Sequence, residues 1–392
     1  MPGHAPLSAL GGRIIWLINV LYLFTKTDVH NLVLPACAAS VIVHATCTPG
    51  GIQVAALASS MAKTLLWGYL GLLVIDVTNQ IVGQDEDAQN KSFRPLIAGL
   101  ISTRGAWRIA VSSAALFAII SFSLGVAWSG ASFIAATFVY NFTGAARNWL
   151  GKNVLNAGGY ACFFVAGGWI AYYDIERWTA ATADLQRDVA FTISTLVLLQ
   201  FASISATITI QDLRDVDGDL RVRRATQNLA WGERPARVAV ALALAVFSAL
   251  GAPTVWRTTA AIILQSLGYE VPGHRVARGE SSLRSFVCVA TYCIEVALAV
   301  LISWRILHDR PSYDVVDGLD GRLVSRICDV RQTARRLNVH LARSEYAQRN
   351  GRDSNYGEEL SRRIKRAQYK RDDDSFKLYI LWLLLNMVTS VV

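Results

Sequence analysis

The chain has 392 residues, of which 53% are hydrophobic and 17% are charged, and its formal net charge is +9. Soluble domains carry about 25% charged residues, so this composition and a mean hydropathy of +0.34 exclude an ordinary soluble domain. The apolar residues form long uncharged runs without strand-like alternation, which predicts an all-α polytopic membrane protein rather than a membrane barrel. The positive charge then indicates basic loops on one side of the membrane, or attraction to anionic lipid or a phosphorylated substrate. It does not indicate a nucleic-acid partner.

Taken in chain order, the apolar runs predict one helix at the membrane surface and about nine spanning helices. Residues 13–24 are expected to form the interfacial helix, because no signal-peptide cleavage site follows them. Pro253 is expected to interrupt the seventh span, and Thr258–Tyr269 is expected to be re-entrant or a remnant span. The predicted spans are Leu32–Cys47, Thr64–Val82, Trp107–Trp128, Ala131–Ala146, Asn153–Tyr173, Val189–Ile210, Val238–Trp256, Phe286–Trp304 and Phe376–Val392.

The hydrophilic segment 305–375 breaks the membrane pattern and carries many charges of both signs. Apolar residues between Leu323 and Leu341 recur at spacings of three and four, the pattern of an amphipathic helix. A surface or partner-binding helix and a disordered charged insert both remain open. The predicted domains are an N-terminal interfacial segment (1–31), a transmembrane domain (32–304), a hydrophilic cytoplasmic insert or extension (305–375) and a C-terminal transmembrane helix (376–392).

Two of the predicted spans end in acidic residues that are followed by basic ones. The second span runs into DVTNQIVGQDEDAQNKSFRP (76–95), and the sixth runs into QDLRDVDGDLRVRR (211–224). Both segments follow even-numbered spans, so both are expected on the same side of the membrane as the N-terminus. The basic residues in these loops place that side in the cytoplasm, although loop 257–285 is basic on the opposite side.

Oxygen-bearing side chains in each acidic segment repeat at helical spacing. Asn79 and Asp87 share one helical face, and Asp212, Asp215 and Asp219 share another. Two such faces repel each other unless a cation lies between them, and hard oxygen ligands favour Mg²⁺ or Ca²⁺. The predicted metal ligands are Asn79, Glu86, Asp87, Asp212, Asp215 and Asp219.

Basic and amide side chains lie beside these carboxylates and are suited to an anion. Carboxylates for a metal and cations for an anion together predict a site for Mg²⁺ and a diphosphate. A solvated loop of mixed charge is the alternative, but the pattern occurs twice, on one side, at helical spacing. The predicted diphosphate-binding residues are Asn79, Asn90, Lys91, Arg94, Lys152 and Asn153.

Aromatic residues are frequent in the spans that lead to the acidic segments. They indicate an apolar chamber for an isoprenyl chain, in which a good cation–π contact stabilises a carbocation by about 0.5–2 kcal/mol. Most of these rings are expected to serve packing, and two or three to face the chamber. The candidates are Trp67, Tyr69, Tyr140, Phe142, Phe163, Phe164, Trp169, Tyr172 and Tyr173.

At these residues the chain resembles the UbiA superfamily of intramembrane prenyltransferases. Its second motif, DLRDVDGD, is a close match, whereas the first has Gln80 and Gly83 where aspartates are usual in Asn-Asp-x-x-Asp-x-x-x-Asp. NQxxGxxED followed by NKxxRP, together with LYLFTKTD and KNVLNAGGY, looks like the fungal branch that includes UbiA-type terpene cyclases. The resemblance implies a UbiA-like bundle of about nine helices that binds Mg²⁺ and an isoprenyl diphosphate. Residues 315–371 depart from the family pattern, as a genuine extension or a mis-spliced translation.

The resemblance implies an enzyme that ionises an isoprenyl diphosphate, expected to be farnesyl diphosphate, and cyclises it to a terpene. Prenyl transfer to an aromatic acceptor is the alternative. A cation carrier requires charged residues deep in the spans, where Asp76 is the clear case, and an inactive relative would not bind diphosphate with Mg²⁺. The protein is expected in a membrane, with the endoplasmic reticulum as the candidate organelle and the oligomeric state open. The catalytic residues implied are Asp87, Asp212, Asp215 and Asp219.

Overall fold

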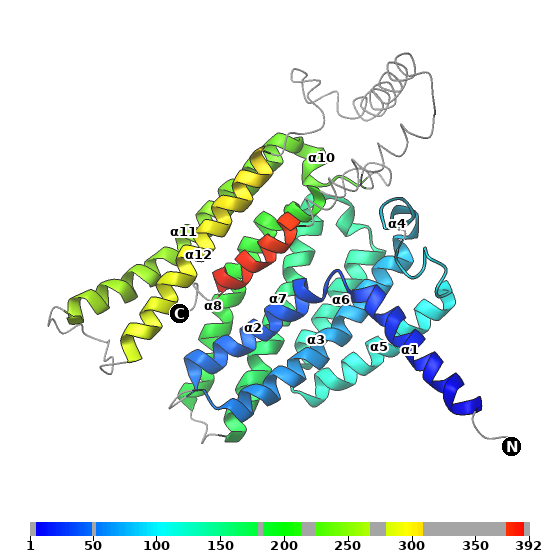
Figure 1. The fold of residues 1–392 in the computed structure, drawn as a ribbon, viewed down its shortest axis with the longest axis horizontal. Helices are drawn as coiled ribbons and strands as arrows, with labels where there is room; N and C mark the ends of the chain where they lie inside the picture. The colour runs from blue at the N-terminus through cyan, green and yellow to red at the C-terminus, as the bar shows by residue number, and fades with distance from the viewer. Residues whose placement is uncertain are drawn as a thin grey trace, which may run out of the picture.

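The computed structural model describes most of the chain as a bundle of helices (Figure 1). Among the described residues there are no strands, and one isolated bridge joins Asn148 to Ala225. This arrangement confirms the all-α fold class. The described residues are 5–48, 52–91, 93–178, 183–213, 219, 224–266, 280–308 and 374–387.

Each predicted span contains a helix of the described structure. Five segments are long and apolar enough to cross a membrane: Val29–Cys47, Val54–Val82, Thr103–Ser123, Trp149–Trp178 and Asp184–Asp212. The helices in chain order are α1 (Ala5–Thr25), α2 (Val29–Cys47), α3 (Val54–Val82), α4 (Gln84–Asn90), α5 (Thr103–Ser123), α6 (Ala127–Phe142), the 3-10 helix η1 (Ala145–Arg147), α7 (Trp149–Trp178), α8 (Ala183–Thr207), the 3-10 helix η2 (Ile208–Leu213), α10 (Gln227–Trp231), α11 (Glu233–Ser266), α12 (Glu280–His308) and an unlabelled helix at 374–387.

Several predicted boundaries differ from the structure. Trp128 belongs to α6 rather than to the third span, because α5 ends before Gly125, whose φ of +74° forms a turn. The helix α11 continues through Pro253 to Ser266, so the predicted interruption and the separate stretch after it are wrong. Proline is tolerated in membrane helices when neighbouring groups satisfy the freed backbone. Residues 309–373, most of the predicted hydrophilic segment, lie outside the described residues.

The N-terminal helix α1 contains the predicted interfacial residues 13–24. Its inner face packs Val20 and Phe24 against Leu73 and Val77 of α3 and Ala106 of α5. Large apolar side chains on its other face are exposed, which suits contact with lipid. The helix therefore lies against the second and third predicted spans.

The centre of the bundle is an aromatic cluster from four helices. Trp67 of α3 lies 4.8 Å, centroid to centroid, from both Phe117 of α5 and Phe163 of α7, and Phe133 of α6 is 4.9 Å from Phe163. The indole of Trp67 donates a hydrogen bond to Ser121 Oγ at 2.8 Å. This cluster fixes α3, which leads into the first acidic segment, against α5, α6 and α7.

The opposite end of the bundle is held by a buried polar network. Ser60 Oγ donates to Asp174 Oδ2 at 3.0 Å and lies 2.9 Å from His44 Nε2. Lys63 forms an ion pair with the same aspartate. These residues come from α2, α3 and α7, so the network joins the three helices far from the acidic segments.

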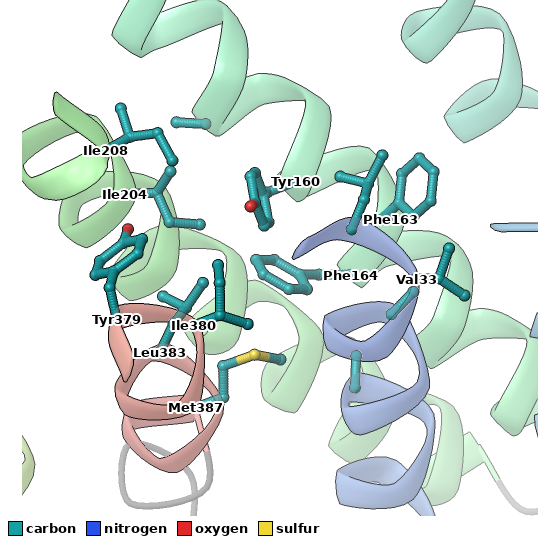
Figure 2. Close-up of a cluster of buried hydrophobic side chains, with 14 of the residues drawn as sticks. Val33, Tyr160, Phe163, Phe164, Ile204, Ile208, Tyr379, Ile380, Leu383 and Met387 are labelled. Carbon is teal, nitrogen blue, oxygen red and sulfur yellow. The ribbon is translucent and has the colours of Figure 1, made fainter. Parts of the chain in front are cut away.

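The helix 374–387 packs into the bundle although it is distant in sequence. Figure 2 shows Tyr379, Ile380, Leu383 and Met387 on this helix facing apolar side chains of α7, α8 and η2. Asn386 Nδ2 donates to Glu295 Oε1 of α12 at 2.9 Å. Glu295 is fully buried within a predicted span. Asp76 is therefore not the one acidic residue that lies deep in the predicted spans.

Close approach of α2 and α7 depends on Gly167. A Cβ atom at Gly167 would lie 2.3 Å from the carbonyl oxygen of Ala36, whereas one at Gly158, also in α7, would meet nothing within 4 Å. Small residues of this kind allow membrane helices to pack backbone to backbone.

We expect Gly167→Ala to lower the stability of the protein by about 1–3 kcal/mol, because the added methyl group forces the helices apart. Gly158→Ala is the matched control and should leave stability unchanged or slightly higher, since alanine favours a helix. Thermal unfolding of both variants in detergent measures the difference. Equal melting temperatures would contradict the close contact.

Candidate functional site

The two acidic segments line one cavity of about 170 Å³. The first segment contributes residues from α3, α4 and the chain directly after α4, and the second contributes residues from η2 and the chain before α10. Figure 1 shows α4 and α10 at the same end of the bundle. The residues of the two segments that line the cavity are Asp76, Asn79, Gly83, Glu86, Asp87, Lys91, Arg94, Gln211, Asp212 and Arg224.

Local structure brings the first segment into the cavity. The helix α3 ends at Val82, the next residue Gly83 donates its N–H to Asn79 O at 2.8 Å, and α4 begins at Gln84. Asp85, Glu86 and Asp87 occupy the first turn of α4, where the helix dipole stabilises negative charge. The acidic residues thus lie at the start of a short helix above the membrane-spanning part of α3.

Asp87 and Arg94 form a buried ion pair at the cavity wall. Arg94 Nη1 donates to both carboxylate oxygens at 2.6 Å, and Asp87 is only 2% exposed. Burial raises the pKa of Asp87, and the charge of Arg94 opposes that rise. Two of the predicted site residues are therefore brought into direct contact.

On the second segment, Asp212 pairs with Lys152 of α7. The α-helix α8 continues directly into the 3-10 helix η2, which contains Asp212. Asn153 makes hydrogen bonds on both sides of this transition. Asn153 Nδ2 donates to Ser205 O at 3.1 Å and to Thr209 Oγ1 at 3.0 Å. Asn153 was predicted to bind diphosphate, but it is not among the residues that line the cavity; its amide instead positions the segment that carries Asp212.

Arg224 links the two segments. Its guanidinium lies 3.1 Å from Glu86 Oε2 of the first segment and 3.1 Å from Asp219 Oδ1 of the second. Its position is set by the backbone, because Ala225 N–H donates to Arg147 O at 2.8 Å. In the sequence, Arg224 is one of several basic residues in this loop and has no pattern of its own. The dense run of arginines after the second motif was the available signal.

Asp219 is fully buried beside Arg224 but is not on the cavity wall. Burial raises the pKa of Asp219 to about 7, and the charges of Lys152 and Arg224 oppose the rise while that of Asp212 adds to it. Among the other predicted residues, Asn79, Glu86 and Lys91 line the cavity. Asp215 lies outside the described residues, as does the side chain of Asn90.

Most of the suggested aromatic rings do not reach the cavity. Tyr140 lines it, as suggested, together with Phe133 and Tyr160, which had not been singled out. Trp67 and Phe163 belong to the central cluster and are fully buried. Whether a ring reaches the cavity depends on which face of its helix turns toward the cavity. The number of aromatic residues in a span does not reveal that face.

The cavity wall suits a divalent cation together with an anion. It carries five carboxylates and four cationic side chains, so an added diphosphate leaves an excess of negative charge. Within the described residues no three acidic, histidine or cysteine side chains converge as a preformed metal site. However, Asp219 Oδ2 is buried without a hydrogen-bond partner among the described residues, and Asn79, Glu86, Asp87 and Asp212 place further oxygen atoms on the wall. These oxygen donors fit Mg²⁺ held partly by substrate phosphates.

Comparison with known proteins identifies the type of molecule. The sequence model of the UbiA prenyltransferase family matches residues 32–304. The chain is 31% identical over 229 residues to somaliensene A/B synthase of Streptomyces somaliensis, covering 58% of this chain and 70% of the relative. It is 27% identical over 263 residues to fumagillin beta-trans-bergamotene synthase of Aspergillus fumigatus (65% and 81%). It is 30% identical over 213 residues to a polyprenyl transferase of Hericium erinaceus (52% and 66%).

The fold is similar to that of a solved structure. A UbiA homolog from Archaeoglobus fulgidus, bound to GPP and Mg²⁺, superposes with a TM-score of 0.51 at 15% identity. The match covers 79% of this chain and 94% of the homolog. At this identity the similarity shows a common fold.

Removal of Arg224 tests its bridging role. We expect Arg224→Gln to lower stability by about 1–3 kcal/mol, because Glu86 and Asp219 lose their shared donor in a partly buried site. Arg104→Gln, at an exposed position of α5, controls for loss of one positive charge and should have little effect. Thermal unfolding in detergent measures both. A variant as stable as the control would show that the bridge contributes nothing.

Proposed function

Because the chain belongs to the UbiA prenyltransferase family, we propose that it binds an isoprenyl diphosphate with Mg²⁺, ionises it and cyclises the cation to a terpene. Farnesyl diphosphate is the substrate we propose. The observation that carries the proposal is the single cavity in which two acidic segments and four cationic side chains converge. Two of the relatives are named as terpene synthases, which favours cyclisation.

The cationic side chains bind and orient the diphosphate. Lys91, Arg94, Lys152 and Arg224 line the cavity from three separate parts of the chain, so they can surround an anion. Arginine offers two parallel donors to a phosphate, and lysine acts as a point charge. As the carbon–oxygen bond breaks, negative charge grows on the diphosphate, and donors fixed around it stabilise that charge.

The carboxylates Asp87 and Asp212 are the proposed centre of the metal site, with Asn79, Glu86, Asp215 and Asp219 as further ligands. Mg²⁺ would supply charge neutralisation for the diphosphate. In the structure Asp87 and Asp212 are each paired with a cation, and we propose that these cations turn toward the phosphates when substrate binds. The same carboxylates thus hold Arg94 and Lys152 at the site before it is filled.

Apolar residues form the deeper wall of the cavity and exclude water. Leu32, Leu72, Phe133 and Tyr160 lie there with Leu155. An allylic cation in such a place is not captured by solvent, and an aromatic ring face stabilises it by about 0.5–2 kcal/mol.

We propose that the active-site loops face the cytoplasm.

Prenyl transfer to an aromatic acceptor is the second candidate. The family is named for this activity, and one relative is named as a polyprenyl transferase. The two candidates share ionisation and differ in the fate of the cation.

Substitution of the paired carboxylates tests the site. We expect Asp87→Asn and Asp212→Asn each to slow Mg²⁺-dependent release of diphosphate from farnesyl diphosphate by about 100-fold or more, because charge stabilisation at the leaving group is lost. Asp85→Asn is the matched control, since Asp85 is exposed on the same short helix and does not line the cavity. Turnover by Asp212→Asn at the rate of the unaltered protein would refute the assignment.

The products distinguish the two candidates. Purified protein incubated with farnesyl diphosphate and Mg²⁺ alone should yield a terpene hydrocarbon, detected by gas chromatography. Chelation of the metal should stop the reaction, and added Mg²⁺ should restore it. Turnover that begins only after a phenolic acceptor is added would instead identify a transferase.

A further inference from the structure

Asp76 is an acidic residue of the cavity that the proposed binding of metal and diphosphate does not use. It lies in α3, is 8% exposed and lines the cavity. Its Oδ2 atom is buried and has no hydrogen-bond partner among the described residues. A carboxylate at this depth in a membrane helix is costly, and such residues generally serve a function.

The other carboxylates on the cavity wall have partners. Asp87 forms an ion pair with Arg94, Asp212 with Lys152 and Glu86 with Arg224. Asp28 accepts hydrogen bonds from Thr27 and Asn31. The carboxylate of Asp76 therefore lies on the cavity wall, and no described side chain occupies its Oδ2 atom.

The helical position of Asp76 sets its depth. It precedes Asn79 by three residues, which is about 4.5 Å along the axis at 1.5 Å per residue. It follows Leu72 by one turn, and both residues line the cavity. Asp76 thus lies between the polar mouth, where the diphosphate is proposed to bind, and the apolar wall below. In the proposed binding mode, the carbon atoms nearest the diphosphate lie beside Asp76.

We propose that Asp76 accepts the proton that ends the carbocation reaction, a role that rests on the proposed function. A C–H bond beside the cationic carbon breaks, and its electron pair forms the carbon–carbon double bond. The proton passes to the carboxylate of Asp76, so that a carboxylate and a carbocation become a neutral carboxylic acid and a neutral alkene. The acid returns its proton to water or to the departing diphosphate when the products leave.

Asp76 is chemically distinct from the metal-binding residues in this scheme. Loss of a metal ligand slows ionisation and product formation together. Loss of the proton acceptor leaves ionisation largely intact, because the diphosphate and its cations are untouched. The cation then persists until water or another base reaches it, and the product changes.

The test compares Asp76→Asn, Asp76→Glu and the exposed control Asp85→Asn with the unaltered protein. Asparagine keeps the size of the side chain but cannot take up the proton. We expect Asp76→Asn to form the hydrocarbon about 100-fold more slowly while releasing diphosphate within about 10-fold of the normal rate, with terpene alcohols from water capture. Asp76→Glu should restore part of the hydrocarbon. Diphosphate release itself reports that each variant is folded.

Two outcomes overturn the inference. An unchanged hydrocarbon rate and profile in Asp76→Asn would show that another group takes the proton. An equal fall in diphosphate release and hydrocarbon would place Asp76 in the ionisation step instead. Failure of the unaltered protein to produce hydrocarbon from farnesyl diphosphate and Mg²⁺ would overturn the proposed function, and this role with it, before any variant is considered.

Discussion

The structure of the site depends on the balance between carboxylates and cations at one end of the bundle. Two acidic segments that are more than a hundred residues apart line the same cavity, and unpaired they would repel each other strongly where burial lowers the dielectric constant. Three buried or partly buried cations prevent this: Arg94 on Asp87, Lys152 on Asp212 and Arg224 between Glu86 and Asp219. Buried pairs are costly when one partner is missing, so each cation is also a structural requirement.

This charge balance explains how one cavity can serve both folding and binding. The cations that hold the acidic segments together are the groups that a diphosphate would attract, and the carboxylates that they release are suited to a divalent metal. Exchange of partners changes the total charge of the site little. A site of this kind avoids the cost of unpaired buried charge both before and after a ligand binds.

The helices below the charges give the cavity its second property, an apolar wall. The aromatic cluster around Trp67 fixes α3, α5, α6 and α7, and the helix 374–387 covers the flank formed by α8 and η2 (Figure 2). Tyr379 approaches Thr207 Oγ1 at 2.9 Å, close to the turn that presents Asp212. The C-terminal helix thereby supports the second acidic segment from behind.

The amino-acid sequence by itself determined the fold class, the approximate positions of the spans and the two acidic segments, because hydrophobic run length and helical spacing are local properties. The family resemblance rested on contiguous motifs for the same reason. Only the tertiary structure decided that Asn153 positions η2, that Arg224 joins the segments, which rings reach the cavity, and that Asp76 lies on the cavity wall with one oxygen atom unpaired among the described residues. Those facts depend on which face of each helix meets its neighbours and on where distant loops return, and neither is encoded in the spacing of residues along one helix.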